Sequence, residues 1–307
     1  MQIAILWQMI LRALQDWWND NCLRLAASLA YYTALSLAPL VLLIVGVVGL
    51  VLDRQQVVHQ LTAQLEGLMG AAGRELVTSI LTTTSPQEGA LATVVGLVTL
   101  FIGATAVFGE LQATMNLIWE VQPAPTSGIW AGIWAWLRER VFSLAIVFAL
   151  AFLLLVSLVI STLLASVAAL FHGSEQALLS RLLELAVSLL VLTFVFALLY
   201  KYVPDAEIGW HDVWTGGLIT AVLFTLGKTA IGYYLGQTSV GSAYGAAGSV
   251  VVLLVWVYYS ALIMFFGAEF THAWATRHGS VTPQPHAVSG AAPQTKSEAI
   301  NDRPPRL

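Results

Sequence analysis

Charged residues are scarce in this sequence. Asp, Glu, Lys and Arg make up 10% of the 307 residues, whereas hydrophobic residues make up 58%. A soluble domain carries about 25% charged residues, so this chain lacks the polar side chains that a surface facing water on all sides needs. The composition excludes an ordinary soluble domain and predicts a polytopic membrane protein.

Other absences narrow the class of protein further. The single cysteine, Cys22, excludes an internal disulfide and offers no metal cluster. The net charge of -4 leaves no basic footprint for nucleic acid. The sequence contains no HExxH, GxSxG, CxxC or phosphate-loop motif. We therefore predict no catalytic residue, no metal ligand and no cofactor, and we do not expect an enzyme.

The N-terminus also lacks the features of a signal peptide. It has no basic n-region, and Gln2 and Gln8 interrupt its apolar residues. Residues 3–20, within an N-terminal segment 1–25, instead predict an amphipathic helix with apolar residues at helical spacing: Ile3, Leu6, Ile10, Leu14, Trp17 and Trp18. This helix is too polar to span a bilayer. It either lies flat on the membrane, where tryptophan suits the headgroup zone, or packs on the protein itself.

Six segments are long and apolar enough to span a membrane, for which a helix needs about 20 residues. They are 26–52, 91–118, 141–171, 182–203, 213–235 and 247–276. The third is longer than a bilayer requires, so we expect it to tilt or protrude. The predicted fold is all-α: a polytopic membrane helix bundle, 26–276, with six transmembrane helices and short amphipathic surface helices.

Two further segments differ from the spans. The loop 53–90 has apolar residues at helical spacing and ends in "TTTSPQEG" (82–89), which predicts one or two short surface helices and then a turn. The tail 277–307 holds five of the ten prolines and, from Gly279 onward, no aromatic residue. It cannot bury enough apolar surface to fold, so we expect a disordered tail.

The distribution of Lys and Arg predicts the orientation. If the N-terminus is cytoplasmic, the inner segments carry nine Lys and Arg residues, and the outer loops carry Arg54, Arg74 and Arg181. Positive residues gather on the cytoplasmic side of membrane proteins. We therefore expect a multi-pass protein with both termini in the cytoplasm and with 53–90 as an extracytoplasmic loop.

The spans contain small residues that permit close helix packing. Ala26, Ala30, Ala34 and Ala38 form a stripe on the first span, which Pro39 is expected to kink. The fifth span carries small residues and a lysine on roughly one face: Gly217, Ala221, Lys228 and Gly232.

Polar side chains inside the spans are the candidate functional residues, because charge at membrane depth is costly. Glu110 and Glu269 are predicted to lie roughly 12 Å and 10 Å from the inner ends of their spans. The other candidates are Tyr31 close to that level, Arg24 below it, Asn116 in the second span, and Lys228 in the outer half of the fifth.

Two interpretations of these side chains remain open. They could form an ion or substrate pathway, with carboxylates that bind a cation or a proton in a vestibule open to the cytoplasm. Alternatively, each glutamate is a hydrogen-bonded packing residue, and the long side chain of Lys228 reaches the outer headgroups.

Five stretches in the same order resemble the YihY/BrkB family of bacterial inner-membrane proteins. They are "LAASLAYYTALSLAPL" (25–40), "FGELQATMNLIWEV" (108–121), "YKYVPD" (200–205), "WTGGLITAVLFTLGK" (214–228) and "SAYGAAGSVVVLLVWVYYSALIMFFGAEF" (242–270). The resemblance implies six helices in the bacterial inner membrane. Members have carried the label ribonuclease BN or virulence factor. The acidic net charge argues against a nuclease, which needs an electropositive surface.

Three functions therefore compete: a transporter, channel or lipid-handling protein; a non-transporting scaffold for envelope integrity; and, least supported, a nuclease. The expected partners are membrane lipids, with a small ion or an anionic lipid as candidate ligand and no nucleic acid. An oligomer is compatible with the sequence.

Overall fold

The structure, a computed structural model, describes residues 2–48, 53–83, 90–121, 174–237, 244 and 247–278. This part of the chain is helical apart from turns and short loops, and it contains no strand. The helices are α1 (Gln2–Asn19), α2 (Cys22–Val48), α3 (Arg54–Met69), α4 (Ala71–Thr83), α5 (Ala90–Ile118), α7 (Ser174–Tyr202), α8 (Trp210–Gln237) and α10 (Gly248–His278). The all-α fold class is confirmed.

Within the described residues, three helices are long and apolar enough to cross a membrane, judged by length and composition. They cover Leu185–Tyr202, Trp210–Gly232 and Gly248–His278, and α2 contains a shorter apolar stretch, Cys22–Ala38. Five predicted spans coincide with α2, α5, α7, α8 and α10. The predicted span 141–171 and the tail from 279 lie outside the described residues, so the number of six spans stays a prediction.

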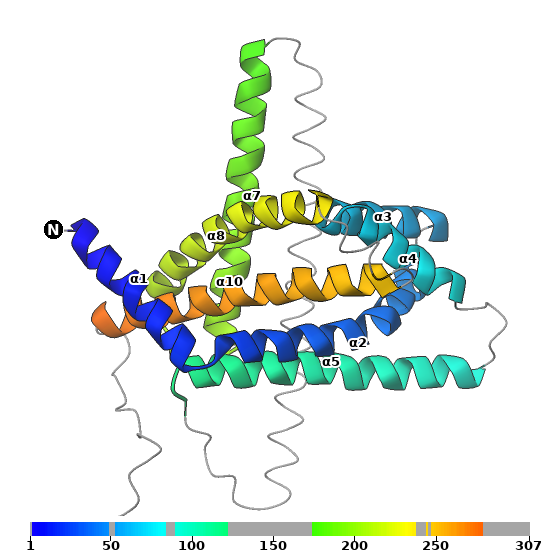
Figure 1. Cartoon of the computed structure of the whole chain (residues 1–307), viewed down its shortest axis with the longest axis horizontal. Coiled ribbons are helices and arrows are strands. Elements are labelled where there is room, and N and C mark those ends of the chain that lie inside the picture. Colours follow the sequence, from blue (N-terminus) through cyan, green and yellow to red (C-terminus); the bar gives the residue numbers. More distant parts are fainter. Residues whose placement is uncertain are drawn as a thin grey trace, which may run out of the picture.

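Helix α10 is the centre of the fold. It contacts α1, α2, α4, α5 and α8, and Figure 1 shows it running between these neighbours. Its buried residues extend from Gly248 to Ala275 and include Phe265 and Phe270. A helix surrounded in this way needs apolar side chains on all faces, which explains why its sequence is a long apolar run without a clear amphipathic period.

Two interlocking glycine–threonine pairs join α8 to α10. A Cβ atom added to Gly216 would overlap the side chain of Thr271, and one added to Gly267 would overlap Thr220. Tyr200 of α7 closes this crossing: its hydroxyl donates to the Met264 carbonyl (2.8 Å) and lies 3.0 Å from Thr220 Oγ1. The bare glycine backbones therefore let the antiparallel helices approach closely, as in small-residue crossings of membrane helices.

Helix α7 crosses the other long helices steeply, and its first half rises away from them (Figure 1). A close approach at Gly217 allows this crossing, because a Cβ there would lie 2.7 Å from the Thr193 carbonyl oxygen of α7. Leu182, Leu183 and Leu185 on the rising half are exposed. The sequence predicted a span that begins at 182, whereas α7 begins at Ser174.

The predicted surface helices in 53–83 form the hairpin α3–α4. Asp53 caps α3 by accepting a hydrogen bond from the Gln55 amide (2.6 Å), and Gly70 turns the chain with φ 67°. Arg74 Nε donates to Glu66 across the hairpin (3.1 Å), and this contact raises the pKa of Arg74. Met69 and Leu76 pack against α10, so the hairpin covers the far end of the bundle.

Helix α1 has two apolar faces. Met9 and Ala13 are buried against Phe270 of α10. The opposite stripe is exposed, with exposed fractions of 60% for Trp7, 47% for Leu11, 50% for Leu14 and 66% for Trp18. Of the two alternatives for this helix, packing on the protein is therefore observed, and the exposed stripe leaves a second face that suits the membrane interface.

Candidate functional site

Glu269 lies at the centre of the candidate site, near the end of α10. The side chain is 1% exposed. Its Oε1 atom lies 4.0 Å from the thiol sulfur of Cys22, a weak donor. The charges of Asp20, Asp16 and Glu120 act on it, and Asp20 also contributes a side-chain hydrogen bond. We call these four acidic residues the carboxyl cluster.

Two tight turns bring the acidic neighbours to Glu269. The turn from α1 to α2 holds Asn21 at φ 56°, a conformation that asparagine tolerates better than most residues, and places Asp20 next to Cys22. The second turn ends α5 and holds Glu120 at φ 52°. There, Val121 donates to the Asn116 carbonyl (2.9 Å). Both turns lie beside the C-terminal part of α10, at what we call the α1 end of the molecule.

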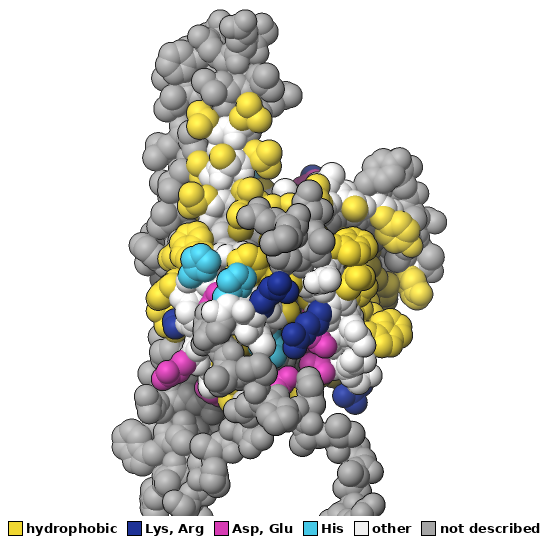
Figure 2. Space-filling model, turned by 90° about the vertical axis from the view of Figure 1, so that its left-hand side faces the viewer, with side chains coloured by type: hydrophobic (Ala, Val, Ile, Leu, Met, Phe, Trp, Pro, Cys, Tyr) yellow, Lys and Arg dark blue, Asp and Glu magenta, His cyan; other side chains and the backbone are white. Residues whose placement is uncertain are grey.

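Charged and aromatic side chains gather at this end of the molecule. Figure 2 shows Lys, Arg, Asp, Glu and His side chains gathered on this face, with hydrophobic side chains on the rising part of α7. Trp119 is 4% exposed, and its ring centroid lies 5.2 Å from that of His272. Among the described residues, the indole nitrogens of Trp17, Trp119 and Trp274 are buried without a hydrogen-bond partner. The site therefore combines one buried carboxyl, Glu269, with half-buried acidic neighbours and buried indole nitrogens.

A second polar group, which we call the clasp, lies at the same end and consists of Gln112, Asn116 and Asp205. Asn116 Nδ2 donates to Asp205 Oδ2 (2.9 Å), and the Asp205 amide donates back to Asn116 Oδ1 (2.8 Å). Gln112 Nε2 donates to the same carboxylate (3.2 Å). Through these bonds, the loop between α7 and α8 is fixed to the end of α5.

The clasp can be tested by exchanging the amide of Asn116 and the carboxylate of Asp205. Asn116→Asp replaces the amide donor with a second carboxylate against Asp205 and should lower the free energy of unfolding by about 1–3 kcal/mol. Adding Asp205→Asn restores an amide–carboxylate pair with the donor and acceptor exchanged, so more than half of the loss should return. The free energy of unfolding of both variants is measured on the detergent-purified full chain. A double variant no more stable than Asn116→Asp alone would show that the clasp has no pairwise role.

The structure brings only some of the predicted site residues together. Glu269 is in the carboxyl cluster and Asn116 is in the clasp. Glu110 is half-buried on α5 and is not among the groups whose charge acts on Glu269. The other three are exposed: Arg24, Lys228 and Tyr31, whose ring lies edge-on to Tyr32 at 5.7 Å.

Sequence reasoning missed Asp16, Asp20, Glu120 and Asp205. They lie outside the predicted spans, in turns or near helix ends, where a charged residue needs no special explanation. One pattern in the sequence could have indicated Asp20 and Glu120. The stretches "NDNCLR" (19–24) and "WEV" (119–121) each place an acidic residue near the start or end of a predicted span. Within the described residues, no three His, Cys, Asp or Glu side chains are arranged to hold a metal ion.

Taken together, the apolar helices and the buried acidic residues at one end define a helical membrane protein. Residues 13–291 match the model of the family described as Virulence factor BrkB, and the chain belongs to this family. It is similar to a protein named UPF0761 membrane protein from Alkalilimnicola ehrlichii, with 30% identity over 84% of this chain and 56% of the relative. A relative with the same name from Alcanivorax borkumensis is 28% identical over 88% of this chain and 61% of the relative.

The chain spans roughly three fifths of the length of these two relatives, 56% and 61%. A third relative, a UPF0761 membrane protein from Vibrio cholerae, is 29% identical over 60% of this chain and 59% of the relative. No solved structure matches the chain. The comparisons therefore establish a family of membrane proteins, and their names carry no substrate or reaction.

Proposed function

We propose that this chain is a proton-linked membrane transporter whose proton-binding group is Glu269. The observation that carries the proposal is the burial of the Glu269 carboxyl, which is 1% exposed, beside the acidic side chain of Asp20. A hydrogen bond between two carboxyl groups needs a proton on one of them, because an ionised carboxylate only accepts. Such a pair holds a proton that can be released when the surroundings change.

The surroundings of Glu269 favour a protonated carboxyl over a carboxylate held in a structural ion pair. Within the described residues, no Lys or Arg side chain pairs with Glu269, and the cation that Asp16 meets is Arg12, at 3.6 Å. An ionisable residue inside a membrane protein is by default a candidate for an ion or proton pathway. With both termini in the cytoplasm, as the Lys and Arg distribution predicts, the carboxyl cluster faces the cytoplasm of a bacterial inner-membrane protein.

A change of conformation is part of this proposal. One of the two interpretations of the sequence was a vestibule open to the cytoplasm, whereas Glu269 is 1% exposed in the described state. The α3–α4 hairpin packs over the far end of α2 and α10. In this proposal the described state is closed around Glu269, and transport requires the turns that carry Asp20 and Glu120 to move away from α10.

The second candidate function is a non-transporting scaffold of the cell envelope. The close packing around Glu269 and the interlocked glycines of α8 and α10 favour it, since both suit a rigid helix bundle. Neither candidate is an enzyme, and the carboxyl cluster offers no positive surface that a nuclease would use.

Proton flux distinguishes the two candidates. The full chain, reconstituted in vesicles that contain a pH-sensitive dye, should pass protons under a pH gradient, and Glu269→Gln should reduce the flux at least about tenfold, as expected when an essential proton carrier is lost. Glu75→Gln, an exposed carboxyl on α4, is the matched control and should leave the flux unchanged. Equal flux in Glu269→Gln and wild type would refute the role of Glu269, and no flux in wild type under any gradient would favour the scaffold.

A further inference from the structure

An apolar groove lies in the corner between α7 and α8, away from the carboxyl cluster. Its volume is about 630 Å³, and most of its lining is hydrophobic: Ala186, Leu189, Leu190, Trp214 and Leu218, with Thr193. The Thr193 hydroxyl is already used, because it donates to the Leu189 carbonyl (2.7 Å). Ligand sites in proteins have volumes of about 300–1,000 Å³, so the groove is large enough for a chain-like apolar ligand.

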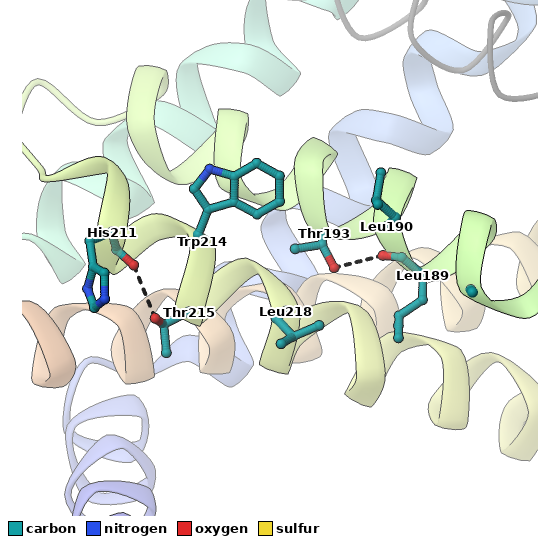
Figure 3. Close-up of a pocket in the computed structure, with 8 residues that line it drawn as sticks. Leu189, Leu190, Thr193, His211, Trp214, Thr215 and Leu218 are labelled. Carbon is teal, nitrogen blue, oxygen red and sulfur yellow. Dashed lines mark hydrogen bonds between the residues drawn. The ribbon is translucent and has the colours of Figure 1, made fainter.

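One end of the groove is polar. Figure 3 shows His211 and Thr215 at one end and Leu189 and Leu190 at the other. The His211 side chain is 82% exposed, and its Nδ1 atom lies 3.8 Å from the buried carboxylate of Asp212. The Thr215 hydroxyl donates to the His211 carbonyl (3.1 Å). The imidazole therefore has one nitrogen beside Asp212 and a second one, Nε2, for a ligand at the mouth.

Aromatic residues indicate the membrane level of this polar end. Tyr202, Trp210 and Trp214 are all exposed there, and such side chains gather at the headgroup level of a bilayer. Leu218 lies about 12 Å further along α8 from Trp210 at the rise of an α-helix. The groove thus begins at the level of lipid headgroups and continues along helices that are apolar enough to lie in hydrocarbon.

We propose that this groove is a phospholipid-binding site, with one acyl chain between α7 and α8 and the headgroup phosphate beside His211. A lipid chain already lies in hydrocarbon, so it gains no hydrophobic transfer on binding. Selection comes from packing in the groove and from the polar contact at the headgroup. The site does not include Lys228, which is exposed and does not line the groove. It does not depend on the proposed proton transport.

Photo-crosslinking tests the proposal. The full chain is reconstituted in phosphatidylethanolamine and phosphatidylglycerol vesicles that contain a phospholipid with a diazirine near the end of one acyl chain. After illumination, mass spectrometry should find the lipid on residues 186–193 and 211–218. Ala186→Phe places a ring in the groove and should lower this labelling roughly tenfold, which corresponds to about 1.4 kcal/mol. Leu226→Phe, an exposed position on α8 outside the groove, is the matched control and should label as wild type does.

The headgroup contact has its own readout. Wild type should label better with the phospholipid probe than with a diacylglycerol that carries the same diazirine chain and no phosphate. His211→Ala, which removes an exposed ring without disturbing buried packing, should make the two probes equal. Labelling spread evenly over all exposed helix faces would overturn the proposal. It would also be overturned if residues 186–193 crosslinked to another part of this chain or to a second copy instead of to the lipid.

Discussion

Gly216→Ala is expected to destabilise the protein severely, by about 3 kcal/mol or more, the upper part of the range for an overpacked core. A Cβ atom at this position would overlap Oγ1, Cβ and Cγ2 of Thr271. Thr271 is itself fully buried, and its hydroxyl is bonded to the Gly267 carbonyl (2.6 Å). The threonine therefore has no free space into which it can move, and the two helices must separate to admit one methyl group.

A glycine on the same helix provides the matched control. Among the described residues, no atom lies within 4 Å of a Cβ added to Gly232. Gly232→Ala should therefore be neutral or should stabilise α8 by up to about 1 kcal/mol, since alanine is the better helix former. When thermal unfolding is measured in detergent, Gly216→Ala should thus lower stability while Gly232→Ala leaves it unchanged or raises it.

A compensating change tests the origin of the effect. The three atoms nearest to the new Cβ all belong to the side chain of Thr271. Adding Thr271→Gly to Gly216→Ala should recover stability, less the cost of about 1 kcal/mol for glycine in a helix. Additive losses in the double variant would mean that the two positions do not interact. The explanation by a close contact between Gly216 and Thr271 would then be wrong.

The helices themselves could be predicted because apolar length is a strong signal in a membrane protein. Helix α10 is the clearest example: 40 residues without Asp, Glu, Lys or Arg lie between Lys228 and Glu269, and most of α10 falls within them. Helix α1 was predicted as amphipathic, yet its two apolar faces did not decide between the membrane and the protein. The structure shows that one face packs on α10 while the other is exposed.

The contacts between helices could not be predicted in the same way. The sequence directed attention to Gly217, Ala221, Lys228 and Gly232 on one face of the fifth span. The structure places Gly217 against α7 and leaves Gly232 open, while the interlock with α10 uses Gly216. Spacing along one helix shows which small residues share a face, but it does not show which neighbour that face meets.

The same limit applies to the candidate site. Depths counted along separate spans placed Glu110 and Glu269 at one level, which assumes that the helices run parallel and face each other. The neighbours of Glu269 instead come from the turn after α1 and the end of α5. A turn that reverses the chain can bring an acidic residue beside a buried glutamate, and no periodicity within the spans reports this.

The final prediction concerns Glu269 and separates its chemistry from its packing. Glu269→Gln should keep or raise stability, by up to about 1–2 kcal/mol, as replacements at functional sites often do. The amide retains the volume of the side chain and can donate to the Asp20 carboxylate without a shared proton. Glu269→Ala should instead cost about 2–4 kcal/mol, because it leaves a cavity at a position that is 1% exposed.

Stability and flux together then decide what Glu269 does. If the carboxyl is a proton-binding group, the Glu269→Gln variant should be well folded but should pass few protons. The amide keeps the packing of the side chain, and it cannot take up and release the proton. If the carboxyl is a packing residue of a scaffold, both substitutions lower the unfolding temperature and neither changes a flux that wild type lacks. A glutamine variant that is as unstable as the alanine variant would contradict the shared proton, since the lost stability would then belong to the carboxylate itself.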